Sequence, residues 1–271
     1  MTEKEYNESE GIRRSDLWKM EDSPEKFKYF LEHPMEQTPA MVFGSACHKM
    51  ILEPETFGNE YAIAPDINRR TNAGKAEWEA FCADNEGKTI ISQDDANVMA
   101  DMEEELEKCR LAKWLIRYGQ HEVPIFWTDP ETGEKCKAKL DVLTKDQENK
   151  YIVIDYKTAT SARTEKFNNS IFSFGYDLQA AMYTEGVQIA LGLDYRPQFA
   201  FVVQEKKPPY AVNVVGVSPE VMEHGDKLYH MLMDKYHTCK ELDEWNGYLP
   251  VDGGINWTDL PAWVEFDEED D

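Results

Sequence analysis

The sequence has few features of a secreted or a membrane protein. Its cysteines, at positions 47, 82, 109, 136 and 239, are odd in number and form no Cys-x-x-Cys pair. This spacing predicts reduced thiols and offers no four-cysteine set for an iron–sulfur cluster. With 30% charged residues and a mean hydropathy of −0.64, we expect no membrane span. The first ten residues are polar and acidic rather than signal-like, so we expect a cytoplasmic protein.

Positive charge is also scarce, because 29 Lys and Arg face 53 Asp and Glu and give a net charge of −24. Non-specific affinity for nucleic acid comes from neutralising phosphates, so this composition argues against a general nucleic-acid binder. It would suit an acidic DNA mimic that binds a basic protein. Residues 137–166 differ, with seven basic side chains against five acidic ones. We therefore expect an acidic exterior with a locally basic cleft.

What the chain does contain is enough apolar sequence for a sizeable core: 41% of its 271 residues are hydrophobic. We predict a single domain over residues 1–264, with a helical N-terminal part over about 10–118 and a catalytic core over about 119–240. Residues 265–271 form an acidic tail that we expect to be disordered. Residues 1–10 are expected to fray. Helical patterns cover 15–20, 23–30, 41–51, 96–115, 177–191 and 221–239, and strand patterns cover 122–128, 135–143, 151–157, 197–204 and 211–217.

The stretch 137–157 reads as two antiparallel strands joined by a polar turn, and it carries the most informative charges. Alternation places Lys137, Lys139 and Asp141 on one face of the first strand, and Ala138, Leu140 and Val142 on the other. Asp155 and Lys157 point together on the second strand. Pairing can therefore bring two carboxylates and a lysine to one patch, which suits a hard divalent ion such as Mg²⁺.

The alternative for these charges is a solvated strand face with a surface ion pair. It is weakened because residues 151–154 are apolar on both faces, as in a central strand, and charges at the end of a buried strand must be paired or bound. His48 lies among apolar residues at helical spacing, where a lone histidine is more often a core residue than a ligand. Glu122 begins an edge strand, where a glutamate is usually solvated.

The ordered series His48, Asp141, Asp155-x-Lys157 and Gln179-x-x-x-Tyr183 resembles the PD-(D/E)xK nuclease superfamily, and more narrowly the phage and prophage exonucleases of the exonuclease VIII (RecE) type. The resemblance covers roughly residues 10–245. It extends to the segments 43–48, 52–57, 65–75 and 127–133.

This resemblance implies an α/β, restriction-endonuclease-like core with a mixed central sheet flanked by helices. It implies a Mg²⁺-dependent exodeoxyribonuclease, with Mn²⁺ as a substitute, that degrades double-stranded DNA from its ends in the 5′-to-3′ direction and leaves 3′ tails for recombination. Asp141, Asp155, the Tyr156 carbonyl and His48 would bind the metal. Lys157 would position the attacking water, Gln179 and Tyr183 would hold the site and the scissile strand, and Glu122 is a further candidate carboxylate.

The basic residues Arg69, Arg70, Lys75, Lys137 and Lys139 are the candidates for DNA binding; for the first three, an exposed loop is an equal alternative. The resemblance further implies a ring-shaped homo-oligomer such as a tetramer, a single-strand annealing protein as partner, and a phage or prophage origin in a bacterial host. Two alternatives stay open: an endonuclease or single-strand-specific nuclease on the same fold, and the acidic DNA mimic.

Overall fold

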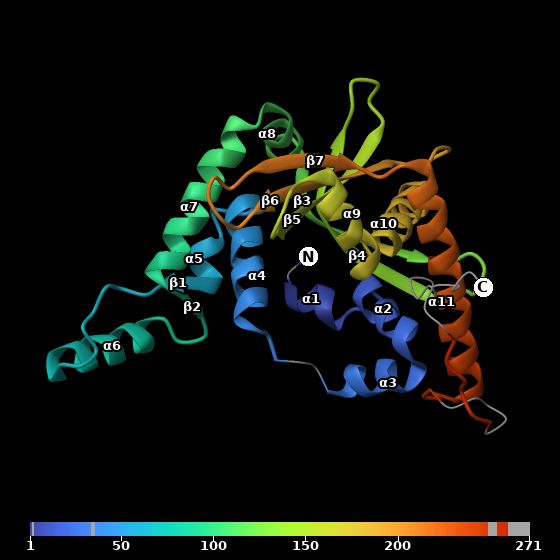
Figure 1. Cartoon of the computed structure of the whole chain (residues 1–271), viewed down its shortest axis with the longest axis horizontal. Coiled ribbons are helices and arrows are strands. Elements are labelled where there is room, and N and C mark those ends of the chain that lie inside the picture. Colours follow the sequence, from blue (N-terminus) through green and yellow to red (C-terminus); the bar gives the residue numbers. More distant parts are fainter. Residues whose placement is uncertain (2, 34–35, 249–253, 260–271) are drawn as a thin grey trace, which may run out of the picture.

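The computed structural model describes residues 1, 3–33, 36–248 and 254–259, so the predicted acidic tail lies outside it. At its centre is a five-stranded sheet in the order β3-β4-β5-β6-β7 (Figure 1). Strands β5 and β6 are parallel and the other neighbours are antiparallel, so the sheet is mixed, as predicted. The strands are β3 (Gln120–Thr128), β4 (Lys135–Lys145), β5 (Tyr151–Ala159), β6 (Gln198–Glu205) and β7 (Val212–Gly216).

Helices cover both faces of this sheet, and capping residues fix where several of them begin. Ser23 accepts a hydrogen bond from the Lys26 N–H with Pro24 at the first helical position, and Ser218 accepts from the Val221 N–H. The helices are α1 (Glu3–Glu8), α2 (Arg14–Asp22), α3 (Pro24–Glu32), α4 (Pro39–Leu52), α5 (Phe57–Glu60), α6 (Asn72–Asp84), α7 (Gln93–Lys108), α8 (Arg110–Arg117), α9 (Thr164–Ser173), α10 (Tyr176–Leu191) and α11 (Pro219–Leu242).

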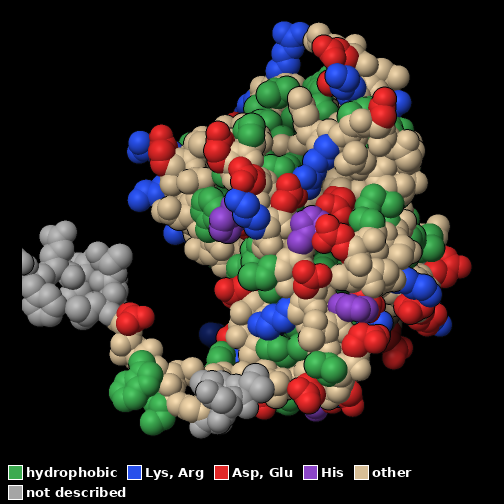
Figure 2. Space-filling view, turned by 90° about the vertical axis from the view of Figure 1, so that its right-hand side faces the viewer, with side chains coloured by type: hydrophobic (Ala, Val, Ile, Leu, Met, Phe, Trp, Pro, Cys, Tyr) green, Lys and Arg blue, Asp and Glu red, His purple; other side chains and the backbone are tan. Residues whose placement is uncertain are grey.

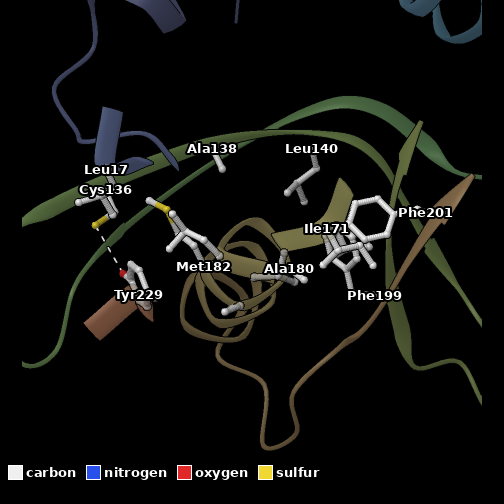
Figure 3. Packing of buried hydrophobic residues seen from close by; sticks show 14 of the residues in the cluster. Leu17, Cys136, Ala138, Leu140, Ile171, Ala180, Met182, Phe199, Phe201 and Tyr229 are labelled. Atoms are coloured by element: carbon white, nitrogen blue, oxygen red, sulfur yellow. Dashed lines mark hydrogen bonds between the residues drawn. The ribbon is translucent and has the colours of Figure 1, made fainter. Parts of the chain in front are cut away.

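Two hydrophobic clusters lie on opposite faces of the sheet. One packs α10 and α11, with α2, α3 and α9, against side chains such as Leu140 and Phe201 (Figure 3). The other packs α4, α7 and α8 against Ile154 and Tyr156. The N-terminal helices contribute to both, because Leu17 of α2 belongs to the first cluster and α4 to the second. No helix in the described ranges is both long and apolar enough to cross a bilayer.

Two local predictions were wrong, and one pair of strands was missed. The first residues do not fray: α1 packs on β3 and β4, with Tyr6 only 6% exposed and 6.0 Å from the Phe126 ring. The pattern over 96–115 is two helices that meet at Cys109. A short parallel pair, β1 (Tyr61–Ile63) and β2 (Thr89–Ile91), was not predicted at all.

Candidate active site

The predicted acidic pair lies where the pairing of β4 with β5 ends. The register of β4 and β5 runs from Lys145 opposite Tyr151 to Val142 opposite Ile154 and stops there. Asp141 is the first residue of β4 beyond the paired part. Strand β5 remains paired with β6 through Ala159, which makes β4 the strand that diverges. Asp141 Oδ2 accepts a hydrogen bond from the Tyr156 N–H at 2.8 Å across the opening. A carboxylate thus takes the place of a backbone partner.

Strand β4 is irregular at this point. Leu140 belongs to the cluster beneath α10, whereas Val142 belongs to the cluster beneath α4. Residues two apart on a regular strand share a face, so the strand turns over at Asp141. On β3, between the paired positions His121 and Val123, Glu122 has a left-handed backbone with φ of +49°. The prediction that Val142 shares a face with Leu140 was therefore wrong.

This irregularity groups Glu122, Asp141 and His48 of α4. His48 Nε2 lies 2.6 Å from Asp141 Oδ2, and Nδ1 lies 3.5 Å from Glu122 Oε1. One ligand atom from each of the three lies within 4.8 Å of the others. Burial alone would lower the pKa of His48, but the charges of Asp141 and Glu122 raise it to about 10. Burial would raise the pKa of Glu122, but His48 and Lys139 lower it to about 2.

Asp155 lies deeper, with 1% exposure, on the side of the sheet covered by α10. Its Oδ1 accepts a hydrogen bond from Gln179 Nε2. The Lys157 ammonium is 2.6 Å from Oδ2, yet this buried oxygen has no partner in hydrogen-bond geometry. Burial and the Asp141 charge raise the pKa of Asp155 to about 6, against the opposing effect of Lys157. Burial would lower the pKa of Lys157, but Asp155 and Asp141 raise it, so Lys157 is an ammonium group.

Tyr183 follows Gln179 by one helical turn. Burial raises the pKa of its hydroxyl, Asp155 raises it further and Arg14 lowers it. Two neighbours were not predicted. Lys157 Nζ lies 4.8 Å from the centre of the Tyr176 ring, and the Arg14 guanidinium lies 5.7 Å from the same ring. Arg14 directly precedes a predicted helix start, but that position does not distinguish a residue of the site from an ordinary surface charge.

The donor set fits a divalent cation. His48 offers an imidazole nitrogen, while Asp141 and Glu122 offer carboxylate oxygens. Asp155 Oδ2 is a buried carboxylate oxygen that has the Lys157 ammonium 2.6 Å away but no donor in hydrogen-bond geometry, so it could also bind a metal ion. The Tyr156 N–H points toward β4, and the carbonyl of the same residue on an extended strand points to the same edge. His48 and Asp141 thus form one cluster with Glu122, and Asp155, which is not part of that cluster, lies beside Lys157.

The surrounding cleft is acidic, which contradicts the expected locally basic cleft. It has a volume of about 660 Å³ and is lined by five carboxylate side chains and three lysines, Lys49, Lys139 and Lys157. Lys139 contacts Glu122 at 2.7 Å and Glu3 of α1 at 2.6 Å. Each of the three lysines has a carboxylate partner. A larger hollow of about 860 Å³ beside α8 is lined by none of the predicted catalytic residues, so volume does not mark the site.

The predicted DNA-binding residues are not brought together. Lys137 is 4% exposed and donates hydrogen bonds to the backbone carbonyls of Tyr6, Asn7 and Ser9. Burial lowers its pKa, and its role is to hold the α1 segment, so its assignment to DNA was wrong. Arg69, Arg70 and Lys75 lie in or before α6, which projects from the body of the molecule (Figure 1).

The chain was compared with known families and structures. Residues 14–250 match the profile of a family described as "PDDEXK-like domain of unknown function (DUF3799)". No match is found among curated proteins. A crystal structure from Eubacterium rectale, described as a "Putative exonuclease", superposes with a TM-score of 0.60 at 15% identity and covers 90% of this chain and 87% of that one. The structure of SSO0001 gives a TM-score of 0.37 at 13% identity, with coverage of 84% and 77%.

Proposed function

Because the chain belongs to the family of the PDDEXK-like domain described as DUF3799, we propose that it is a metal-dependent nuclease that hydrolyses DNA from its ends. One observation carries the proposal: Asp141, Asp155 and Lys157 converge at the point where β4 leaves β5, with His48 and Gln179 on either side. Divalent metal, water and a phosphodiester are the reactants that this set of groups accommodates.

The anionic and cationic side chains have different roles in the proposed reaction. When bound by Asp141, Asp155, His48 and the Tyr156 carbonyl, a divalent ion such as Mg²⁺ supplies Lewis acidity and lowers the pKa of water. Lys157 remains protonated beside Asp155, so it donates hydrogen bonds to the attacking water or to the phosphate and stabilises developing negative charge. Gln179 fixes the carboxylate of Asp155 in orientation.

The acidity of the cleft also favours a metal-dependent reaction. Lysines that are already paired with carboxylates offer little attraction to phosphate, so the apo cleft would repel DNA. Bound cations would reverse that local charge. A protein with a net charge of −24 could thus bind a nucleic-acid substrate through bound cations, without a basic cleft.

The finer assignment rests on the resemblance to RecE-type exonucleases. On that basis we propose Mg²⁺, with Mn²⁺ as a substitute, digestion of duplex ends in the 5′-to-3′ direction, and 3′ single-stranded tails as products. A ring-shaped oligomer and an annealing protein that receives the tails complete the proposal, and a bacterial cytoplasm with phage or prophage genes is the expected setting.

The test is digestion of one duplex labelled at either the 5′ or the 3′ end, with a covalently closed circle of the same sequence as control. We expect Mg²⁺-dependent release of 5′-labelled nucleotide, retention of the 3′ label in a shortened strand, and an intact circle. Cleavage of the circle would indicate an endonuclease, and digestion of single strands alone would indicate a single-strand-specific enzyme. Intact DNA under all metal conditions would favour an acidic DNA mimic.

A further inference from the structure

A second set of metal-ligating side chains lies at the other end of β3. Asp129 follows β3, Glu185 belongs to α10 and His230 belongs to α11. One ligand atom from each of the three lies within 4.8 Å of the others. Asp129 is seven residues beyond Glu122, which at about 3.4 Å per residue places the two carboxylates at most about 24 Å apart along the strand. Figure 2 views the α11 face, where histidine side chains are bordered by acidic ones.

Buried contacts fix the position of this cluster. Asp129 is 1% exposed, and its Oδ1 accepts hydrogen bonds from the N–H groups of Glu131 and Thr132, which fix the carboxylate. Its Oδ2 accepts from the Tyr229 hydroxyl at 3.2 Å. Helix α10 packs closely here, because a Cβ at Gly186 would lie 2.8 Å from the Trp127 ring. Glu185 is therefore held against the end of β3.

Three buried polar atoms around the cluster have no hydrogen-bond partner: Glu185 Oε1, His230 Nδ1 and Trp127 Nε1. Trp127 is only 6% exposed, and its indole lies close enough to the Tyr229 hydroxyl to influence the pKa of that group. Buried polar atoms are rarely left unpaired, so each requires an explanation. A bound cation would satisfy the carboxylate and the imidazole, and a water molecule on the cation would accept from the indole N–H.

Ion pairing within the protein does not provide that explanation. His230 Nε2 is 3.5 Å from Glu185 Oε2 and His230 Nδ1 is 3.6 Å from Glu131 Oε2, both longer than the 2.7–2.9 Å of a charge-assisted hydrogen bond. The nearby cation Arg196 places both terminal nitrogens on Asp226, at 2.7 and 2.6 Å. Burial raises the pKa of Glu185; His230 and Arg196 lower it, and Asp129 raises it.

We propose that Asp129, Glu185 and His230 bind a divalent transition-metal ion, such as Mn²⁺ or Zn²⁺, at a second site that joins β3 to α10 and α11. One imidazole and two carboxylates bind such an ion more tightly than Mg²⁺, here as at the first site. The ion would fix α10 to the sheet. That role is structural: α10 carries Gln179 and Tyr183, six and two residues before Glu185, and the ion would help to hold both in place. The proposal does not depend on nuclease activity.

The experiment counts bound Mn²⁺ by the paramagnetic resonance signal of the free ion. The first site is disabled with the double variant His48→Ala and Asp141→Asn, so any remaining tight site is the second one. We expect this background to bind one Mn²⁺ per chain, to gain thermal stability from it, and to keep it in excess Mg²⁺. Adding His230→Ala, or the isosteric Glu185→Gln, should weaken binding about tenfold or more.

The matched control is His237→Ala in the same background. His237 also lies on α11, is 37% exposed against 33% for His230, and contacts a carboxylate, that of Glu134, at 3.0 Å. It should retain the full affinity for Mn²⁺. The proposal fails if the background binds no Mn²⁺, or if His230→Ala and Glu185→Gln both bind it as tightly as the control. Loss of nuclease activity in the background is expected and does not bear on the result.

Discussion

The backbone N–H of Tyr156 donates a hydrogen bond to Asp141 Oδ2 at 2.8 Å. If the β4–β5 ladder continued in register, that N–H would face Leu140 instead. This side-chain hydrogen bond, in place of a backbone one, connects Asp141 to the strand that carries Asp155 and Lys157. All three groups are therefore held by one buried strand, which is paired with β6 along its whole length.

Asp155→Asn should reduce hydrolysis of linear duplex about 100-fold or more, because it removes the negative charge that a metal and Lys157 require. The fold should survive, since the amide oxygen can still accept from Gln179. Initial rates in Mg²⁺ and thermal melting would test both statements. Asp194→Asn, at an exposed position, is the control and should keep full activity. Near-normal rates in Asp155→Asn would mean that the site is elsewhere.

His48→Ala should raise the Mg²⁺ concentration for the half-maximal rate about tenfold or more. Without metal, His48 is the cation between Asp141 and Glu122, so its loss should lower the melting temperature in chelator. Saturating Mg²⁺ should shrink that difference, because the ion replaces the lost charge. A histidine that only fills the core would instead lower the melting temperature equally with and without Mg²⁺.

The hairpin and the long helices followed from the sequence because local patterns encode them, whereas the mixed sheet was expected from the resemblance. Residues 151–154 are apolar on both faces and lead into the buried centre of β5 at 153–156, and Ser23 with Pro24 begins α3. The convergence of His48 with Asp141, separated by 93 positions, was expected only from the resemblance. No periodicity relates residues so far apart.

The errors arose where tertiary contacts override a local pattern. Alternation assumes a regular strand, and β4 turns over at Asp141 because it leaves β5 there. Nothing in the sequence marks the break at Cys109, but Arg117 reaches back to Glu103 and Glu107 and so fixes α8 against α7. The acidic first residues are ordered through Lys137, a partner more than a hundred residues away.

Comparison of Glu122→Gly with Glu122→Ala should separate backbone strain from function. Both remove a carboxylate beside the metal site and should weaken the Mg²⁺ response. The backbone of Glu122 is left-handed, with φ of +49°, which costs a residue with a Cβ about 1 kcal/mol relative to glycine. Glu122→Gly should therefore unfold at a higher urea concentration than Glu122→Ala. Equal midpoints would show that the conformation carries no such cost.

Glu134 provides a pH-dependent contribution to stability. It is 8% exposed; burial would raise its pKa, but Lys240 at 2.6 Å and His237 at 3.0 Å lower it. A carboxyl group whose pKa is lower when folded stabilises the protein above its unfolded pKa, near 4.5, and this stability disappears as the pH falls through the folded pKa. Glu134→Gln should cost about 1 kcal/mol at pH 7. Urea midpoints measured down to pH 3 should converge with those of the parent.

The last prediction contrasts two sets of basic residues that composition alone treats alike. Lys137 is buried and bonded to three backbone carbonyls, so Lys137→Met should cost about 2 kcal/mol or more of folding stability. Arg70 lies before α6, on the projecting arm, and is exposed. If the arm contacts DNA, Arg70→Ala should leave the melting temperature unchanged and weaken binding of duplex, and it should reduce the salt slope of binding by about one. An unchanged slope would show that the α6 segment does not contact DNA, and the metal-loaded cleft would then be the binding surface.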